Sequence, residues 1–304
     1  SSIFAGATGI QVSTKKPDTY TEKLELIEFK ASIQESTSSP DFAEYRNAHR
    51  YLNFNHNSGD FDQYHLKYHR RMSNDPAKWK ITKQHVAEIV MKAKKSHPGP
   101  GGITFIAIQR AADITVDLIY NIITDMTSDN PTEMPENFHD CFMALLPKKA
   151  DKVTPDGRPA YSPGFTRPIL ISPSLIRIIS QCFLVVLTPH AKEFIHEDQR
   201  GFIPGRNGLV NLNEVNKFFF KHRMKRKADL LLIDFANAFS CLDWKYITTT
   251  LRKIGFPEGW IHSITLLLKT NVKLIHGDRI ENDFVQIRTG CRQGDPLSGI
   301  IFAL

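Results

Sequence analysis

A globular fold that contains both helices and strands is predicted by three observations. A helical period of apolar residues starts at Thr82, short apolar runs typical of strands occur at 141–146 and 230–233, and 41% of the 304 residues are hydrophobic. A chain of this length can bury a substantial core, arranged as one large domain or two smaller ones.

The composition indicates which partners and which compartment to expect. Lys and Arg outnumber Asp and Glu by 39 to 32, which gives a net charge of +7 and favours a polyanionic partner without proving one. The four cysteines are far apart in sequence and form no CxxC pair, so we expect a reducing, intracellular compartment, with the mitochondrion as one option. The most apolar run is interrupted by Arg177 and Gln181, so we predict a soluble protein with no membrane partner. A start at Ser1 fits removal of a leader peptide or a trimmed chain.

Residues 1–80 are interpreted as an N-terminal extension. They lack a sustained apolar period, contain the polar run QESTSSP, and become rich in His, Tyr, Asn and Arg near FNHNSGDFDQYHLKYHRR. Aromatic and basic side chains in alternation can grip RNA by stacking and phosphate contacts. An arm that lies on its own domain or on a protein partner explains the same composition, and both alternatives stay open.

The next elements follow from periodicity and turn residues. Val86, Ile89, Val90 and Ala93 share one face of a helix that begins after Thr82 and ends before the turn SHPGPGG. This turn lacks the GxxxxGK(S/T) and GxGxxG patterns of phosphate cradles, so we interpret it as a plain loop. A second helix is predicted from about 106 to 126.

Two strands and a third helix come next. The run CFMALLPKK reads as a strand that feeds an exposed loop, and RPILI, opened by Arg167, reads as another strand. Ser174 is predicted to cap a helix whose Ile176 and Phe183 point inward and which ends near Pro189.

A basic run, KHRMKRK, separates an aromatic stretch from the next apolar strand, where we expect a solvated hairpin. Five of its seven residues are basic, and we predict that they contact nucleic acid: Lys221, Arg223, Lys225, Arg226 and Lys227. The alternative is a charged surface that only faces water.

The apolar strand 230–233 delivers Asp234 at its carboxyl end. Active sites gather at such strand ends, and phosphoryl transfer with two divalent ions requires carboxylate ligands, so Asp234 is a candidate metal ligand. Near the end of the sequence, Asp295 and Pro296 fit the N-cap and first position of a helix, so we interpret Asp295 as structural.

Six segments together resemble the reverse transcriptases of non-LTR retrotransposons, of the LINE-like kind found in protists. They cover residues 82–304 in the family's order, and these are SHPGPGGI, LLPKK, TRPILISPSLIRIIS, QRGFIPGRN, LLLIDFANAF and GCRQGDPLSGIIFAL. The resemblance implies an α+β right-hand polymerase, with a fingers-like region at 81–228 and a partial palm at 229–304 that holds an antiparallel sheet with flanking helices.

The resemblance also implies roles for single residues. Asp234 matches the catalytic, Mg²⁺-binding aspartate, and Phe239 matches the aromatic residue that lies beneath the nucleotide sugar and excludes a 2'-hydroxyl. A core Phe on a short helix is the plainer interpretation of Phe239. Further matches are nucleotide-binding or nucleic-acid-binding: Lys148 with Lys149, Arg167, Gln293 and Arg206.

The chain departs from the family pattern at several positions. Asn237, Ser240, Gly101 and Gly299 replace the family's Lys, Asp, Asp and Pro, and no (Y/F)xDD motif occurs within the 304 residues. The first aspartate of that motif shares its two ions with Asp234, so catalysis by these residues alone is not expected. The terminal apolar helix lacks a polar face, so either the natural protein continues or a protein partner buries it.

Two functions fit these observations. The one that we favour from the sequence is a catalytically incomplete, RNA-binding component of a ribonucleoprotein such as an organellar ribosome, which needs no cofactor. The alternative is the N-terminal part of an active RNA-directed DNA polymerase, which uses Mg²⁺ on RNA or an RNA/DNA hybrid. An unrelated basic α/β protein would require all the ordered matches to be accidental.

Overall fold

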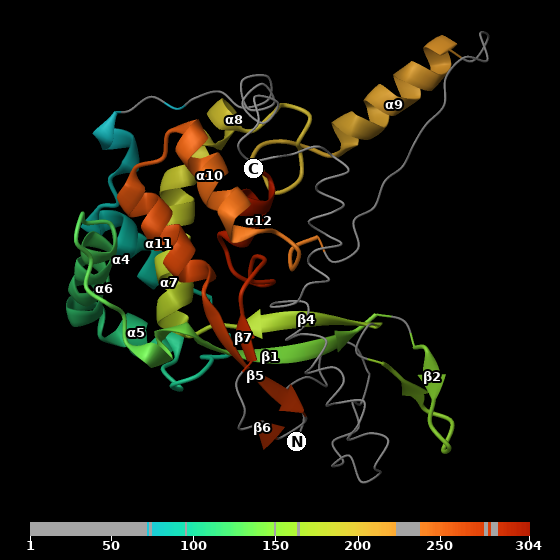
Figure 1. The fold of residues 1–304 in the computed structure, drawn as a ribbon, viewed down its shortest axis with the longest axis horizontal. Helices are drawn as coiled ribbons and strands as arrows, with labels where there is room; N and C mark the ends of the chain where they lie inside the picture. The colour runs from blue at the N-terminus through green and yellow to red at the C-terminus, as the bar shows by residue number, and fades with distance from the viewer. Residues whose placement is uncertain are drawn as a thin grey trace.

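A helical layer packs against one sheet in the computed structural model (Figure 1). The structure describes residues 72, 75–94, 96–148, 150–162, 165–222, 238–276, 279–280 and 285–304. The helices of the described part are η1 (Pro76–Trp79), α4 (Lys83–Lys92), α5 (Phe105–Arg110), α6 (Ala112–Met126), η2 (Glu136–His139), α7 (Ser174–Leu187), η4 (Thr188–His190), α8 (Ala191–Phe194), α9 (Leu209–His222), α10 (Trp244–Ile254), α11 (Glu258–Leu268) and α12 (Ser298–Phe302).

The strands form a mixed sheet and a small separate hairpin. Their bounds are β1 (Asp140–Pro147), β2 (Lys152–Val153), β3 (Pro159–Ala160), β4 (Thr166–Ile171), β5 (Thr270–His276), β6 (Arg279–Ile280) and β7 (Val285–Ile287). The sheet has the order β4-β1-β5-β6, with β7 also paired to β5, and β2 pairs β3 by itself. Strands β1 and β5 run parallel, whereas β1 with β4 and β5 with β7 run antiparallel. An α+β fold is therefore present. The described sheet is mixed because β1 runs parallel to β5, whereas the pairs within 229–304, β5 with β6 and β5 with β7, are antiparallel; the division into fingers and palm stays a prediction.

The predicted helix after Thr82 is confirmed as α4. The Thr82 hydroxyl accepts from the His85 amide at 3.2 Å, and the His85 ring accepts from the Thr82 amide, so the two residues form a capping box. Val86 and Val90 are fully buried, as the period requires. This local pattern was enough to fix the helix.

The helix predicted over 106–126 is divided into α5 and α6 at Ala111, whose backbone leaves the helical region. Gln109 joins α5 to the end of α4. Its side-chain amide donates to the carbonyls of Val90, Met91 and Ala93 at 3.0, 3.2 and 3.0 Å, which closes the last turn of α4. These hydrogen bonds fix α5 against the C-terminal end of α4.

The strands predicted around CFMALLP and RPILI are confirmed as β1 and β4, and the helix after them as α7. Ser174 is not its N-cap, however, because the helix starts at Ser174 itself and the N-cap is Pro173. The Ser174 amide instead donates to the Pro98 carbonyl at 3.1 Å, which ties the helix to the SHPGPGG loop. Tertiary contact replaced the local cap.

Helix α7 is the central helix of the core. Ile176, Ile179 and Phe183 are at most 1% exposed. The stretch Ser174–Phe194 has the length and hydropathy of a membrane-spanning helix, which our sequence prediction did not anticipate, and 56% of that window is buried inside the protein. Burial of this kind is typical of a core helix.

The core crosses the predicted region boundaries. Trp79 lies at ring-centroid distances of 4.6 Å from Phe256 and 5.2 Å from Trp260, and the Met72 amide donates to the Ile254 carbonyl at 2.8 Å. The packed body therefore includes at least Met72 and residues 75–80 of the segment that we interpreted as an extension.

The terminal apolar helix also packs inside the chain. Ile300 and Ile301 of α12 are each 2% exposed and belong to the same core cluster as α7 and α11. The chain itself therefore buries these two side chains, and a protein partner on the rest of this helix stays a prediction.

Helix α9 projects away from the other helices (Figure 1). Its anchor to the body is Arg200, whose guanidinium donates to both carboxylate oxygens of Glu214 at 2.9 and 3.0 Å. Several apolar side chains of α9 are exposed, among them Leu209, Leu212 and Phe220. The predicted hairpin and strand after this helix lie outside the described residues.

Candidate functional site

The loop 288–295 is held between two segments that are far from it in sequence. The Gly290 amide donates to the Leu242 carbonyl, and the Cys291 amide donates to the Phe239 carbonyl, both at 2.7 Å. On its other side, the Leu170 amide of β4 donates to the Gln293 carbonyl at 3.0 Å. The loop thus joins the turn after the predicted metal-binding segment to the strand that carries Arg167.

Two glycines permit this close fit. Gly290 has φ +82°, and a Cβ there would lie 2.6 Å from the Ser240 carbonyl oxygen and 2.7 Å from that of Phe239. Gly294 has φ +109°, and its Cβ would lie 3.1 Å from the Leu170 carbonyl oxygen. A side chain at Gly290 would be strained and would also push the turn away.

Arg292 anchors the loop from inside. It is 2% exposed, and its Nε donates to the Thr270 hydroxyl at 2.7 Å while an Nη donates to the Lys269 carbonyl. A second Nη lies 3.4 Å from the Ser172 hydroxyl. The guanidinium therefore ties the loop to the start of β5 and the end of β4.

Asp295 is structural, as we predicted, but it is not a helix cap. Helix α12 starts three residues later, and the Asp295 carboxylate accepts from the Leu297 amide and from the Ser180 hydroxyl of α7, both at 2.9 Å. Burial raises the pKa of this carboxyl, and the nearby Arg292 and Arg177 oppose the rise. The predicted cap is wrong because α12 begins only at Ser298, so Asp295 closes the turn before that helix and joins it to α7.

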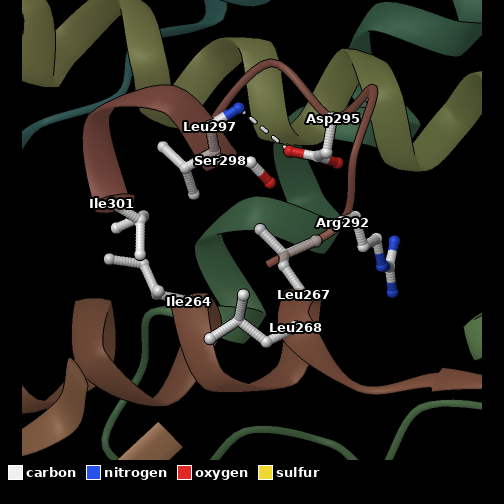
Figure 2. Close-up of a pocket in the computed structure, with 8 residues that line it drawn as sticks. All are labelled: Ile264, Leu267, Leu268, Arg292, Asp295, Leu297, Ser298 and Ile301. Atoms are coloured by element: carbon white, nitrogen blue, oxygen red, sulfur yellow. Dashed lines mark hydrogen bonds between the residues drawn. The ribbon is translucent and has the colours of Figure 1, made fainter. Parts of the chain in front are cut away.

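A small pocket lies under this loop (Figure 2). Its eight lining residues are mainly aliphatic: Ile264, Leu267, Leu268, Arg292, Asp295, Leu297, Ser298 and Ile301. Figure 2 shows the aliphatic side chains of α11 and α12 facing each other across it. The pocket is a packing gap between helices and offers no room for a substrate.

Phe239 is half-buried among aromatic rings. It stacks on Phe302 with a centroid distance of 4.7 Å and an interplanar angle of 24°. The rings of Phe239 and Phe202 meet edge to face, with a centroid distance of 5.6 Å and an interplanar angle of 89°. Phe239 is thus a packed residue that keeps part of its surface open, and its predicted role beneath a nucleotide sugar stays a prediction.

Gln293 has one buried polar atom that no described residue satisfies. Its side-chain Oε1 has no hydrogen-bond partner, whereas its backbone carbonyl is fixed to Leu170. An unpaired buried oxygen costs free energy unless a water or ligand completes it. Among the predicted nucleotide-binding residues, Gln293 therefore has a buried oxygen that can accept a hydrogen bond from a ligand or a water.

Lys148 and Arg167 lie at the same end of the β1–β4 hairpin. Leu146 pairs with Arg167 in the strand register, and the Lys148 amide donates to the Phe165 carbonyl at 2.9 Å. Both cationic side chains are exposed. The structure brings these two predicted phosphate ligands together on one edge, and their contact with a nucleotide stays a prediction.

Arg206 shapes the loop that precedes α9. Its guanidinium donates to the carbonyls of His196 at 2.5 Å, Gln199 at 2.8 Å and Ile195 at 2.9 Å. These bonds give Arg206 a structural role; a contact with nucleic acid stays a prediction.

Several predicted site residues are not described by the structure. Lys221 is exposed near the end of α9, but the other basic residues of its run, together with Lys149 and the candidate metal ligand, lie outside the described residues: Arg223, Lys225, Arg226, Lys227 and Asp234. Within the described residues, no group of three or more His, Cys, Asp or Glu side chains could hold a metal ion. The Mg²⁺ site at Asp234 stays a prediction.

Sequence reasoning missed the role of Arg177. This residue interrupts the apolar face of α7, and its guanidinium donates to the Ser96 hydroxyl at 2.8 Å and to the His97 carbonyl. The same cation lies 4.6 Å from the centroid of the Phe105 ring. The signal in the sequence was an arginine in an otherwise apolar helix, which we used only to argue against a membrane span.

Known proteins give an independent comparison. A sequence model of the family described as "Reverse transcriptase (RNA-dependent DNA polymerase)" matches residues 146–304. The chain is 26% identical over 238 residues to the Pol polyprotein from the type-1 retrotransposable element R2 of Popillia japonica, covering 73% of this chain and 29% of that protein.

Two further relatives agree. The Pol polyprotein from the type-2 element R2DM of Drosophila melanogaster is 28% identical over 214 residues, which is 69% of this chain and 18% of that protein. The Transposon TX1 uncharacterized 149 kDa protein of Xenopus laevis is 24% identical over 208 residues, which is 68% of this chain and 15% of that protein. The chain spans less than a third of the length of each of these relatives.

These relatives are retrotransposon proteins, and the family match covers more than half of the chain. The narrower resemblance to protist elements stays a prediction. The ordered motifs, the family match and the relatives agree, and the chain belongs to the reverse transcriptase family, in the branch of the non-LTR retrotransposons.

Proposed function

We propose that this chain forms the fingers and the first part of the palm of an RNA-directed DNA polymerase from a non-LTR retroelement. The observation that carries the proposal is the position of loop 288–295, which hydrogen-bonds both to Phe239 and to Leu170. One loop thereby links the segment after Asp234, the strand of Arg167 and Gln293. These are the parts that a nucleotide site needs to have together.

Each part has a distinct task in this proposal. Lys148, which follows β1, and Arg167 of β4 bind the triphosphate, because exposed cations that lie close together can share its charge and Arg holds phosphate oxygens bidentately. Phe239 lies against the sugar. The Gln293 Oε1 accepts a hydrogen bond from the nucleotide or from a water at its edge.

Asp234 supplies a carboxylate to magnesium. When bound, Mg²⁺ neutralises charge that develops on the transferred phosphoryl group. A second carboxylate is required as well, and the family carries it in the (Y/F)xDD motif, which does not occur in residues 1–304. The protein to test is therefore the natural protein that contains both this chain and such a motif.

The template strand is RNA in this proposal, with the basic run from Lys221 as a phosphate contact. The interpretation that we favoured from the sequence, a scaffold of a ribonucleoprotein, fits the relatives less well, since they are named as retrotransposon proteins. The polymerase alternative is supported at least as strongly, and no feature of the described residues points to a ribosome.

Primer extension on an RNA template with Mg²⁺ tests the proposal. We expect extension by the natural protein, its loss in Asp234→Ala, and its retention in Asp129→Ala, which removes a carboxylate from an exposed turn. RNA binding by both variants should equal that of the wild type and should weaken with salt by a slope of about −0.7 per phosphate contact. Tight RNA binding without extension by the wild type would instead favour the scaffold interpretation.

A further inference from the structure

Phe202 has an unusual backbone for a bulky residue. Its φ is +63°, in the left-handed region, and it is the only residue other than glycine with a positive φ among the described residues. Its side chain is 58% exposed, so burial alone does not hold it there. A conformation of this kind persists when neighbouring contacts determine it, and it is often found at functional sites.

Gly299 supplies one of those contacts. A Cβ at Gly299 would lie 2.8 Å from Cδ1, 3.1 Å from Cγ and 3.2 Å from Cβ of Phe202. The ring of Phe202 therefore occupies the space that a side chain at position 299 would need. Gly299 is also one of the departures noted above, since the family motif has proline at this position.

Phe239 supplies the second contact. The rings of Phe202 and Phe239 meet edge to face at 5.6 Å, and Phe239 also stacks on Phe302 at 4.7 Å. Gly299 and Phe302 are three residues apart on α12, so they lie on the same side of that helix. The short helix α12 thus contacts Phe202 near its start, at Gly299, and Phe239 at its end, through Phe302.

The backbone of Phe239 is fixed independently of its ring. Its carbonyl accepts from the Cys291 amide at 2.7 Å, so the orientation of the ring is the freedom that remains. Phe302 limits the ring on one side, and Phe202 limits it on another. Removal of Phe202 would release one of these two limits.

We propose that Phe202 is a positioning residue for the ring of Phe239, and that Gly299 leaves the space that Phe202 requires. The pair thereby sets how closely Phe239 fits the sugar of the incoming nucleotide. This inference rests on the polymerase function proposed above. It adds to that function a specificity device formed by Phe202 and Gly299, which act through the ring of Phe239.

The matched variants are Phe202→Ala, Gly299→Ala, the double variant, and Gly208→Ala as the control. Gly208 has an ordinary φ and nothing within 4 Å of its ideal Cβ, so it receives the same methyl group without a clash. The measured quantity is the ratio of kcat/KM for a deoxynucleotide to that for the matching ribonucleotide, in the natural protein that extends primers.

Each single variant should lower this preference for deoxynucleotides by about two- to tenfold, the factor that corresponds to one edge-to-face aromatic pair. The double variant should fall no further than Phe202→Ala, because Gly299→Ala acts by displacing a ring that is already absent. The control should match the wild type. Unchanged preference in both single variants, or additive losses in the double variant, would overturn the inference.

A readout that needs no catalysis separates this inference from the proposed function. 4-Fluorophenylalanine placed at position 239 reports the surroundings of its ring by ¹⁹F NMR. We expect its resonance to move in Phe202→Ala and Gly299→Ala but to stay in place in Gly208→Ala. If the wild type extends no primer, the polymerase proposal fails, and the resonance alone decides whether Phe202 positions Phe239; a resonance that stays in place in all three variants refutes that positioning.

Discussion

Substitution of Gly290 by alanine tests the clamp between loop 288–295 and the turn after Phe239. The new Cβ would lie 2.6 Å from the Ser240 carbonyl oxygen and 2.7 Å from that of Phe239, so the two segments must separate. Separation breaks three hydrogen bonds: from the Gly290 amide to the Leu242 carbonyl, from the Cys291 amide to the Phe239 carbonyl, and from the Trp244 indole to the Gly290 carbonyl at 2.9 Å.

The magnitude follows from these contacts. Each hydrogen bond contributes about 1 kcal/mol net, so the loss of three lowers the free energy of unfolding by about 3 kcal/mol. The left-handed backbone of Gly290, at φ +82°, adds about 1–2 kcal/mol for any residue with a Cβ. The total expected loss is about 4–5 kcal/mol.

Gly157→Ala isolates the strain from the contacts. Gly157 has φ +80°, and nothing lies within 4 Å of its ideal Cβ, so its substitution carries the strain alone. Urea unfolding of both variants, followed by tryptophan fluorescence, should show Gly290→Ala less stable than Gly157→Ala by about 3 kcal/mol with an unchanged m-value. Equal losses in the two variants would show that the loop is not clamped as described.

Three further predictions concern the groups around this loop. Arg292→Met should lower the free energy of unfolding by about 3 kcal/mol in urea, because it leaves the partners of a buried cation unsatisfied, and a loss below about 1 kcal/mol would contradict the anchoring role. Burial raises the pKa of Asp295 above its ordinary value of 3.8. At pH values between 3.8 and this raised pKa, the folded protein binds more protons than the unfolded protein, so Asp295 becomes increasingly destabilising as the pH rises. The free energy of unfolding of Asp295→Asn, minus that of the wild type, should therefore increase with pH over this range when both are unfolded in urea. A difference that stays constant or falls would contradict the raised pKa. Burial raises the pKa of Cys182 and Cys291 to about 12 and also raises the pKa of Cys241, but only Cys241 of these three is partly exposed. Iodoacetamide at neutral pH should therefore label Cys241 first, and equal labelling rates by mass spectrometry would contradict the packing.

Features that depend on neighbours in sequence could be predicted from the sequence. The apolar period after Thr82 became α4, and the apolar runs around β1 and β4 became strands, because periodicity and β-propensity act over a few residues. The order of motifs was also enough to identify the family, since the match and the relatives agree with it.

Features that depend on distant contacts could not be predicted in this way. Gln109 of α5 reaches across to three carbonyls at the end of α4, and Asp295 bonds Ser180 of α7 in addition to the nearby Leu297 amide. In both cases one polar side chain bonds to another element that the local sequence does not identify.

The sequence by itself determined the family, the positions of α4, α7, β1 and β4, and the residue types of the candidate site. Only the tertiary structure decided which of those residues meet. It placed Gln293 beside β4, closed Gly290 onto the turn of Phe239, and set Phe202 on Gly299. The physical reason is that steric exclusion and burial depend on what lies within a few ångströms in space, and residues 202 and 299 carry no mark in the sequence that they will become neighbours.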